Sequence, residues 1–202
     1  HGQGFIEGSA WNYGLYVPHA IDSLIAWHGG NAAFIAHLDS LFTMRLDDVY
    51  FAHTEDISRD GIIGNYVHGN EPGHHIAYLY NYAGAPEKTQ ARVRMICESM
   101  YGPDVNGLCG NDDAGQMSAW FLFSSLGFYP VAPGSGWYDL GAPLVRSAVI
   151  KVGDQILQIE TEGAGDGALV ERILWNGEVI QGLRIHADQI LQGGTLRFEF
   201  KG

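Results

Sequence analysis

Apolar residues recur at helical spacing through the first two-thirds of the chain, where glycine, aspartate and asparagine mark the loops. The clearest case follows Asn31, which can cap a helix start, because apolar side chains then return at the i, i+3, i+4 and i+7 positions through Phe42. The same spacing, ended by glycine or opened by proline, predicts further helices. We expect a helical array whose loops share one end. The further helices cover residues 19–28, 73–82, 86–100 and 115–126.

The pattern changes near residue 145, after which short β-rich runs alternate with turn signals. Asn176-Gly177 lies between two apolar runs and is the strongest short signal for a hairpin. We therefore predict an α+β fold, with a helical part over residues 1–145 and a small antiparallel β-sheet or half-sandwich over 146–202. Polar residues do not gather in this second part, which favours a structural role for it. The predicted strands are 148–152, 156–161, 169–175, 179–180, 189–192 and 195–200.

Charge narrows the range of partners. Lys plus Arg number 11 and Asp plus Glu number 23, so the formal net charge is −12. This balance argues against nucleic acid or an anionic membrane surface and permits a cation or a neutral polar ligand such as a sugar. No apolar run has the length of a membrane span, and two cysteines exclude a disulfide-built scaffold. The chain opens at His1 without an initiator Met or a signal peptide, as expected of a mature, trimmed or excised piece.

The first candidate for chemistry is Glu7, which is followed by glycine and then by Trp11 and Tyr13. A carboxyl beside aromatic rings loses solvation, which raises its pKa toward the range that a general acid needs near neutral pH. The alternative is an exposed loop glutamate without a chemical role.

The second candidate is the run HGNEPGHH. Asn70 and Glu71 offer hard oxygen ligands just before a predicted helix, and His68 and His74 flank them. Three histidines so close together could indicate zinc, but neither a fitting cysteine partner nor an HExxH spacing accompanies them. The alternative is that His74 and His75 only cap or pack at the start of the helix.

The third candidate is the run NDDAGQ, which contains Asn111, Asp112, Asp113 and Gln116. A helix N-terminus attracts a carboxylate, so one acid could be a simple cap. Two acids and two amides exceed that need, and adjacent acids away from water require a cation or a partner. Oxygen-only ligands select a hard cation, and calcium accepts irregular loops more readily than magnesium. Together with Glu7, these acids supply the two carboxyls that a glycosidase requires.

Three long motifs carry a resemblance to a known family. They are EGSAWNYGLYVPHAIDSLI, GNYVHGNEPGHHIAYLYNYAG and GLCGNDDAGQMSAWFLFSSLGFYPVAPG, and the similarity continues through YDLGAPL into the β-rich tail. In this order they resemble glycoside hydrolase family 92 over nearly the whole chain. The resemblance implies a calcium-dependent, exo-acting, inverting α-mannosidase, and many members cleave α-1,2-linked mannose from N-glycans or mannans. It also implies an N-terminal β-sandwich and an (α/α)6 barrel, of which residues 1–145 would form a part.

Matching positions imply roles for individual residues. Glu7 resembles the general acid in the motif EGxxWxY, and Asp113 resembles the base that activates water, with Asp112 in support. Calcium ligands are expected among Asn70, Glu71, Asn111 and Asp112. Contacts to the sugar are expected from Trp11, His68, Glu71, His74 and Gln116.

The chain resembles only the C-terminal portion of such an enzyme, without the sandwich and the first half of the barrel. We expect the missing N-terminal part of the enzyme, or self-association, to cover the exposed helix faces. The expected substrate is a mannose-containing glycan, and the expected location is extracellular, periplasmic or at the cell surface of a bacterium. The alternative is a catalytically inert piece that binds sugar or calcium, or that only completes a larger fold.

Overall fold

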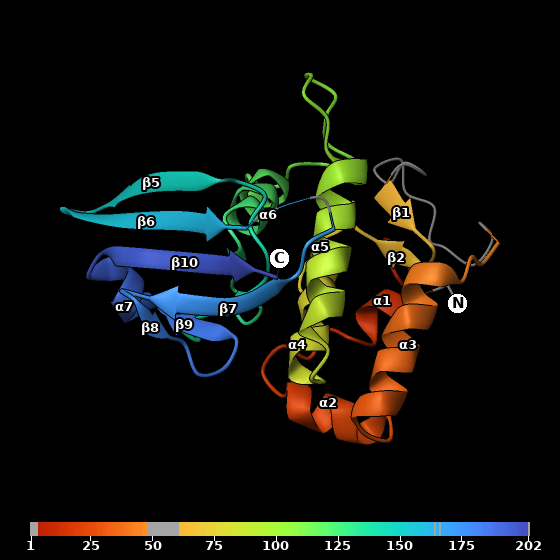
Figure 1. Ribbon diagram of the computed structural model, residues 1–202. Helices are drawn as coiled ribbons and strands as arrows, with labels where there is room; N and C mark the ends of the chain where they lie inside the picture. Colours follow the sequence, from red (N-terminus) through yellow and green to blue (C-terminus); the bar gives the residue numbers. More distant parts are fainter. Residues whose placement is uncertain (1–3, 48–60, 164, 166, 202) are drawn as a thin grey trace.

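The helical part of the chain comes first and lies on one side of the molecule (Figure 1). The computed structural model describes residues 4–47, 61–163, 165 and 167–201. Two 3₁₀ turns, Glu71–Gly73 and Ile76–Tyr78, follow a short antiparallel hairpin of β1 (Ile62–Ile63) and β2 (Tyr66–Val67). The helices of this part are α1 (Ala10–Tyr13), α2 (Ile21–Trp27), α3 (Asn31–Thr43), α4 (Leu79–Tyr82), α5 (Pro86–Met100) and α6 (Gln116–Ser125).

The predicted helices are confirmed, with two local corrections. Asn31 is the first residue of α3 rather than its cap, because Gly30 occupies the cap position with a φ of 98°. The helix predicted over 73–82 is broken into the two 3₁₀ turns and the short α4. Pro72 lacks a backbone donor and Gly73 has low helix propensity, so the chain enters this segment in tight turns.

The terminal part forms one larger sheet, in the strand order β5-β6-β10-β7-β8. The hairpin predicted at Asn176-Gly177 is confirmed, because β7 and β8 pair in antiparallel fashion across it and both turn residues have positive φ. A three-stranded sheet, β3-β4-β9, joins the two parts of the chain. The strands are β3 (Phe128–Tyr129), β4 (Trp137–Leu140), β5 (Ser147–Val152), β6 (Gln155–Glu162), β7 (Val170–Trp175), β8 (Glu178–Val179), β9 (Arg184–His186) and β10 (Gly194–Phe200).

Two predictions for this part are wrong. The sheet is mixed rather than antiparallel, because β10 pairs in parallel with β6 from Gly194 opposite Leu157 onward. The run predicted as a strand over 189–192 belongs to helix α7 (Ala187–Leu191). The His186 side chain caps this helix by accepting from the backbone N–H of Asp188, and the Gln189 side chain accepts from the backbone N–H of His186. Strand propensity alone does not reveal such a capping box.

Helix α6 lies between the helices and the sheet (Figure 1) and contributes to both apolar cores. Met117 and Trp120 pack among the helices, Leu126 packs with the sheet, and Phe123 contacts both cores. The second core also includes Phe128, which precedes residue 145. The division at 145 stays a prediction, and pairing of β4 with β9 crosses it.

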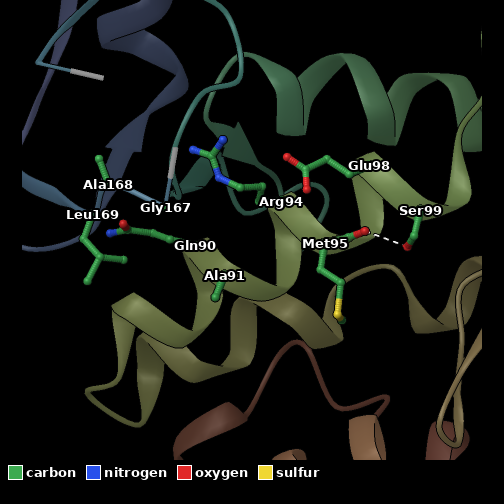
Figure 2. Close-up of a pocket in the computed structure, with 9 residues that line it drawn as sticks. All are labelled: Gln90, Ala91, Arg94, Met95, Glu98, Ser99, Gly167, Ala168 and Leu169. Atoms are coloured by element: carbon green, nitrogen blue, oxygen red, sulfur yellow. Dashed lines mark hydrogen bonds between the residues drawn. The ribbon is translucent and has the colours of Figure 1, made fainter. Parts of the chain in front are cut away.

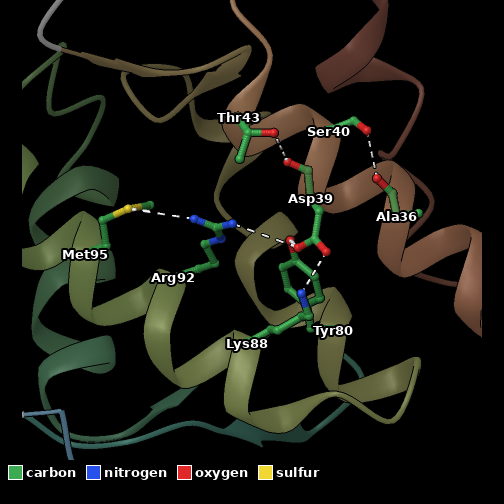
Figure 3. A network of polar contacts seen from close by, with 8 residues as sticks. All are labelled: Ala36, Asp39, Ser40, Thr43, Tyr80, Lys88, Arg92 and Met95. Atoms are coloured by element: carbon green, nitrogen blue, oxygen red, sulfur yellow. Dashed lines mark hydrogen bonds and ion pairs between the residues drawn. The ribbon is translucent and has the colours of Figure 1, made fainter.

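A polar network ties α3 to α4 and α5 (Figure 3). Asp39 accepts from Lys88 Nζ at 2.7 Å and from the Tyr80 hydroxyl at 3.0 Å, and Arg92 approaches it at 3.9 Å. The Arg92 guanidinium also lies 4.9 Å from the centre of the Phe42 ring.

Within the residues that the structure describes, no helix is long and apolar enough to cross a membrane.

Candidate active site

Glycines bring the second and third motifs into direct backbone contact. A Cβ atom on Gly61 would lie 2.6 Å from the carbonyl oxygen of Cys109, and one on Gly69 would lie 2.9 Å from the same atom. A Cβ on Gly110 would meet the backbone of Gly69 as closely. Only glycine permits this approach, so the loop that carries Asp112 and Asp113 rests directly on the segment that leads to Glu71.

Two asparagines attach the first motif to the second. Asn12 accepts from the backbone N–H of Val67 and donates to the carbonyl of Asn65, both at 3.0 Å. The Asn70 amide donates to the Tyr13 hydroxyl at 2.9 Å and reaches the backbone carbonyl of Glu7 at 3.5 Å. The segment that carries Glu7 is thereby held beside β2 and the turn that follows it.

Glu71 lies near two other acids, Glu7 and Asp113. The pKa of Glu71 is raised, chiefly because burial removes water from its carboxyl. A bond to its own backbone N–H opposes this, whereas the nearby charges of Asp113 and Glu7 and a shared hydrogen bond with Asp113 raise it further. We call Glu7, Glu71 and Asp113 the carboxyl cluster. It joins all three sequence motifs.

Asp113 is held in a strained turn. Asp113, Ala114 and Gly115 all have positive φ, at 37°, 58° and 89°, and the first two are not glycine. Such conformations cost on the order of 1–3 kcal/mol each and persist where the surroundings enforce them. Here Asp112 supplies that support, since its two carboxylate oxygens accept from the backbone N–H and the hydroxyl of Ser118 at 2.8 and 2.9 Å. Asp113 itself is exposed.

His68, which directly follows β2, belongs to a chain of buried hydrogen bonds. The Tyr101 hydroxyl donates to the Met117 carbonyl at 3.1 Å, so it must accept from Nε2–H of His68 at 2.7 Å. Nδ1 of His68 is then an acceptor for the Tyr66 hydroxyl at 2.7 Å. Burial, with a smaller contribution from the charge of His74, holds the pKa of His68 well below its usual range, so this ring is neutral.

His74 continues the same arrangement. Its Nε2 donates to the His68 carbonyl at 3.0 Å, and its Nδ1 accepts from the Gln116 amide at 3.2 Å. The same amide nitrogen donates to the Tyr129 hydroxyl at 3.1 Å. Burial lowers the pKa of His74 to about 4, although the bond to the His68 carbonyl opposes the shift. The exposed fractions of His68 and His74 are 0% and 1%, so both rings are buried and are held by protein groups.

A cavity of about 290 Å³ opens beside Glu71. We call it the site cavity. Gln116 also faces it, so two of the residues predicted to contact sugar line one hollow. Sequence reasoning missed most of the other lining residues, because they come from distant loops that no local pattern relates to one another. They are Tyr16, Pro72, His75, Tyr129, Pro130, Val131 and Pro133.

Other predicted residues lie elsewhere. The Trp11 ring stacks on His37 of α3 with centroids 4.6 Å apart. Asn111 is exposed in the loop before Asp112. Their predicted contacts with sugar and metal stay predictions. Tyr13, which sequence reasoning used only as an aromatic neighbour of Glu7, is instead the partner of Asn70.

In this region the histidine nitrogens and the carboxylate oxygens differ in how far protein groups engage them. The described parts of the chain contain no group of three or more His, Cys, Asp or Glu side chains arranged to hold a metal ion. The ring nitrogens of His68 and His74 are engaged by protein groups. Oε1 of Glu71, in contrast, is buried and finds no hydrogen-bond partner among the described residues. A carboxylate oxygen in that position is the type of ligand that calcium accepts.

A second hollow, of about 350 Å³, lies between α5 and the segment before β7 (Figure 2). Arg94 and Glu98 border it, but no member of the carboxyl cluster does. Gln90 at its edge accepts from the backbone N–H of Val170 at 2.9 Å, which ties the sheet to the helix. None of the predicted site residues borders this second hollow.

Comparisons with known proteins show the family of this chain. The family model described as "Glycosyl hydrolase family 92 catalytic domain" matches residues 1–202. The structure of the family GH92 α-mannosidase BT3965 from Bacteroides thetaiotaomicron, in complex with mannoimidazole, is 38% identical with a TM-score of 0.88. The alignment covers 96% of this chain and 25% of that one.

Two more relatives extend the comparison. The family GH92 inverting mannosidase BT2199 from the same organism is 32% identical with a TM-score of 0.81, over 98% of this chain and 28% of that one. An uncharacterized secreted glycosidase from Arthroderma benhamiae is 28% identical over 195 residues, which are 94% of this chain and 23% of that protein. The chain therefore spans about a quarter of the length of these relatives.

Proposed function

This chain belongs to glycosyl hydrolase family 92, and we propose that it supplies the catalytic carboxyls of an α-mannosidase, with Glu7 as general acid and Asp113 as general base. One observation carries the assignment of roles. The partly buried Glu71 carboxyl lies close enough to Glu7 and Asp113 for their charges to raise its pKa, which supports one site built from both ends of the helical part. Glycoside hydrolysis needs two carboxyls on opposite sides of one sugar ring.

The chemistry follows from the different surroundings of the two acids. Glu7 is half-buried at the end of a segment fixed by Asn12 and Asn70, which suits a group that must deliver a proton to the glycosidic oxygen. Asp113 is exposed at the tip of its loop, which suits a group that takes a proton from water. Glu71 lies between them, and Asp112 holds the Asp113 turn through Ser118.

We propose inversion at the anomeric carbon, with a water between the base and the sugar. The similar mannosidase BT2199 is described as inverting. Inversion requires the two carboxyl groups to lie about 6.5–9.5 Å apart, rather than the shorter separation of retaining enzymes.

We propose calcium as the cofactor, held by Glu71 through Oε1 together with Asn70. Asp112 and Asn111 are weaker candidates, because the Asp112 oxygens already bind Ser118 and Asn111 is exposed. When bound, the ion would orient vicinal sugar hydroxyls and neutralise charge beside the acids. Chelation should abolish activity, and calcium should restore it better than zinc. Full activity in excess chelator would contradict the calcium assignment.

The proposed substrate is a terminal, α-1,2-linked mannose of an N-glycan or a mannan, released outside the producing cell. The similarity to a secreted glycosidase supports this location. Since the chain spans about a quarter of its relatives, we propose that the remainder of a longer protein, or a second copy of this chain, completes the site cavity.

The test compares Glu7→Gln and Asp113→Asn in the complete protein, on a mannobiose and on a nitrophenyl mannoside. Each variant should lose about 10²–10⁴-fold in kcat/KM on the disaccharide, as expected when a positioned acid or base is removed. The loss for Glu7→Gln should shrink on the nitrophenyl substrate, because an acidic leaving group needs less protonation. The loss for Asp113→Asn should not shrink, because every substrate still needs an activated water.

Matched controls come from the terminal sheet. Glu178→Gln and Asp154→Asn make the same chemical changes at exposed positions and should leave kcat/KM unchanged. Equal damage by Glu7→Gln on both substrates, or rescue of Asp113→Asn by the better leaving group, would show that the two roles are wrongly assigned.

A further inference from the structure

A larger cavity, of about 560 Å³, has no member of the carboxyl cluster in its lining. We call it the distal cavity. The segment from Pro18 to Ser23 forms one wall, and the sheet residues Trp137 and Arg184 form another. Tyr82 of α4 contributes a third side.

The same two loops contribute to the lining of both cavities. Tyr16 borders the site cavity, and Pro18 and His19 border the distal cavity. Likewise Val131 borders the first and Ala132 the second. A chain-like ligand with one end near Glu71 could therefore reach the distal cavity over neighbouring residues of the same loops.

Trp137 offers an aromatic surface to this cavity. Its exposed fraction is 43%, although the residue lies in the central strand of a sheet. His186 pairs with Trp137 across the strands and holds its ring edge-on, with centroids 4.9 Å apart. Gly136 leaves room for that contact, because a Cβ there would lie 2.6 Å from Nε2 of His186. The indole is thus fixed in place rather than merely exposed.

Arg184 offers a fixed fork of donors on the same face of the sheet. Asp139 pairs with Arg184 across the strands and accepts from its Nε at 3.2 Å. The guanidinium carbon lies 4.3 Å from the centre of the Tyr82 ring, and the Tyr82 hydroxyl donates to Asp139 at 3.0 Å. The Arg184 side chain still keeps 41% of its surface exposed. An ordered guanidinium of this kind presents planar, bidentate donors to a ligand.

We propose that the distal cavity is a second binding site for a neutral saccharide, separate from the site of hydrolysis. The apolar face of a sugar ring can pack on the Trp137 indole while adjacent hydroxyls bind the Arg184 fork. Asp22, Ser23 and His19 supply further polar groups from the opposite wall. An anionic ligand fits less well, because Asp22 and Asp139 accompany the single arginine of this lining. The site would hold a more distant unit of the glycan, so its place in catalysis rests on the proposed function.

The test uses the complete protein with Glu7→Gln, which prevents turnover during calorimetric titration with an α-mannotriose. Trp137→Ala should weaken binding by about tenfold or more, the usual loss when an aromatic anchor is removed. Arg184→Lys keeps the charge beside Asp139 but removes the fork, and it should weaken binding in the same direction. Trp27→Ala is the matched control, since Trp27 is 80% exposed and lies outside the cavity lining.

Kinetic measurements in the active protein, which keeps Glu7, separate this proposal from the proposed function. Trp137→Ala should raise KM for a long mannan oligosaccharide and leave kcat/KM for a nitrophenyl mannoside unchanged. Absence of hydrolysis by the unaltered protein would reject the proposed function, whereas the titration would still report the second site. Unchanged titrations for both Trp137→Ala and Arg184→Lys would overturn the saccharide site. Competition of inorganic phosphate with the α-mannotriose would overturn the neutral class of ligand.

Discussion

The region around the carboxyl cluster and the terminal sheet are built from different interactions. Around the cluster, buried side chains include Asn12, His68, Asn70 and His74, and each has a polar partner. In the described part of the chain after Asp139, the buried residues are apolar. In the terminal sheet they are Leu157, Ile159, Ile173, Leu196, Phe198 and Phe200, and Ile185 of β9 packs into the same core.

This difference shows what each region can tolerate. Apolar burial is non-directional and tolerates volume-conserving exchange. A buried polar network costs a desolvation penalty for every partner that is lost, but it fixes geometry. The backbone conformations of the two regions differ as well. At the candidate site Asp113 and Ala114 have positive φ, which strains a residue other than glycine, whereas in the sheet Asn176 has positive φ in a hairpin turn that suits it.

The largest expected effect on stability lies in the sheet. Phe198 is fully buried in the second core, so Phe198→Ala should lower the free energy of unfolding by about 3–5 kcal/mol. Specific activity per folded molecule should stay unchanged, because Phe198 lies outside the lining of the site cavity. Urea unfolding and kcat measured on the folded fraction provide the check. A selective loss of kcat would contradict the separation of the two regions.

The second prediction concerns pH. Burial lowers the pKa of His74 from 6.5 to about 4, so the unfolded chain takes up this proton at a higher pH than the folded chain does. The stability that neutral His74 contributes is therefore complete above about pH 6.5 and is lost as the pH falls toward 4. From His74 alone the loss should approach about 3 kcal/mol.

The measurement is urea unfolding at several pH values, compared with His74→Asn, which keeps a donor and an acceptor but does not titrate. The variant should show a weaker fall in stability between pH 6.5 and 4. Other buried groups act in both directions, since the pKa of Asp139 is raised to about 6, chiefly by burial. Only the difference between the two proteins reports His74, and identical pH profiles would refute the assignment.

The third prediction breaks the buried hydrogen-bond chain of His68. His68→Leu leaves the Tyr66 hydroxyl without its acceptor and the Tyr101 hydroxyl without a donor, and should cost about 2 kcal/mol. Activity should fall in the folded fraction, because the loop of Asp113 and the turn of Glu71 lose a shared support. Tyr101→Phe removes one hydroxyl and should produce a smaller loss of stability and a smaller loss of activity. Unchanged kcat in folded His68→Leu protein would assign His68 to stability alone.

The smallest effects compare two left-handed residues. Ala114→Gly should stabilise the protein by about 0.5–1 kcal/mol, because it relieves a positive φ that alanine disfavours. Asn176→Gly should destabilise the protein by a similar amount, because Oδ1 of Asn176 accepts from the backbone N–H of Thr195 at 2.8 Å and this bond would be lost. Thermal unfolding distinguishes the two. Stabilisation by both changes would contradict the different roles given to these turns.

Local pattern was sufficient for much of the fold. The apolar stripe of α3, the proline at the start of α5 and Asn176-Gly177 each act within one or two turns of chain, so sequence alone predicted them correctly. The error at α7 arose because His186 and Gln189 cap that helix through side chains, which strand propensity does not register. The parallel pairing of β6 with β10 depends on partners far apart in the chain.

The candidate site divides in the same way. Sequence alone marked Glu7, Glu71 and Asp113 as acids in unusual surroundings and related the chain to its family. The tertiary structure decided that these acids lie close enough for their charges to act on Glu71, that His68 and His74 are buried, and that Asp112 binds Ser118. The reason is physical: local spacing specifies helices and turns, whereas close approach at Gly61, Gly69 and Gly110 and burial from water arise only when distant segments pack together.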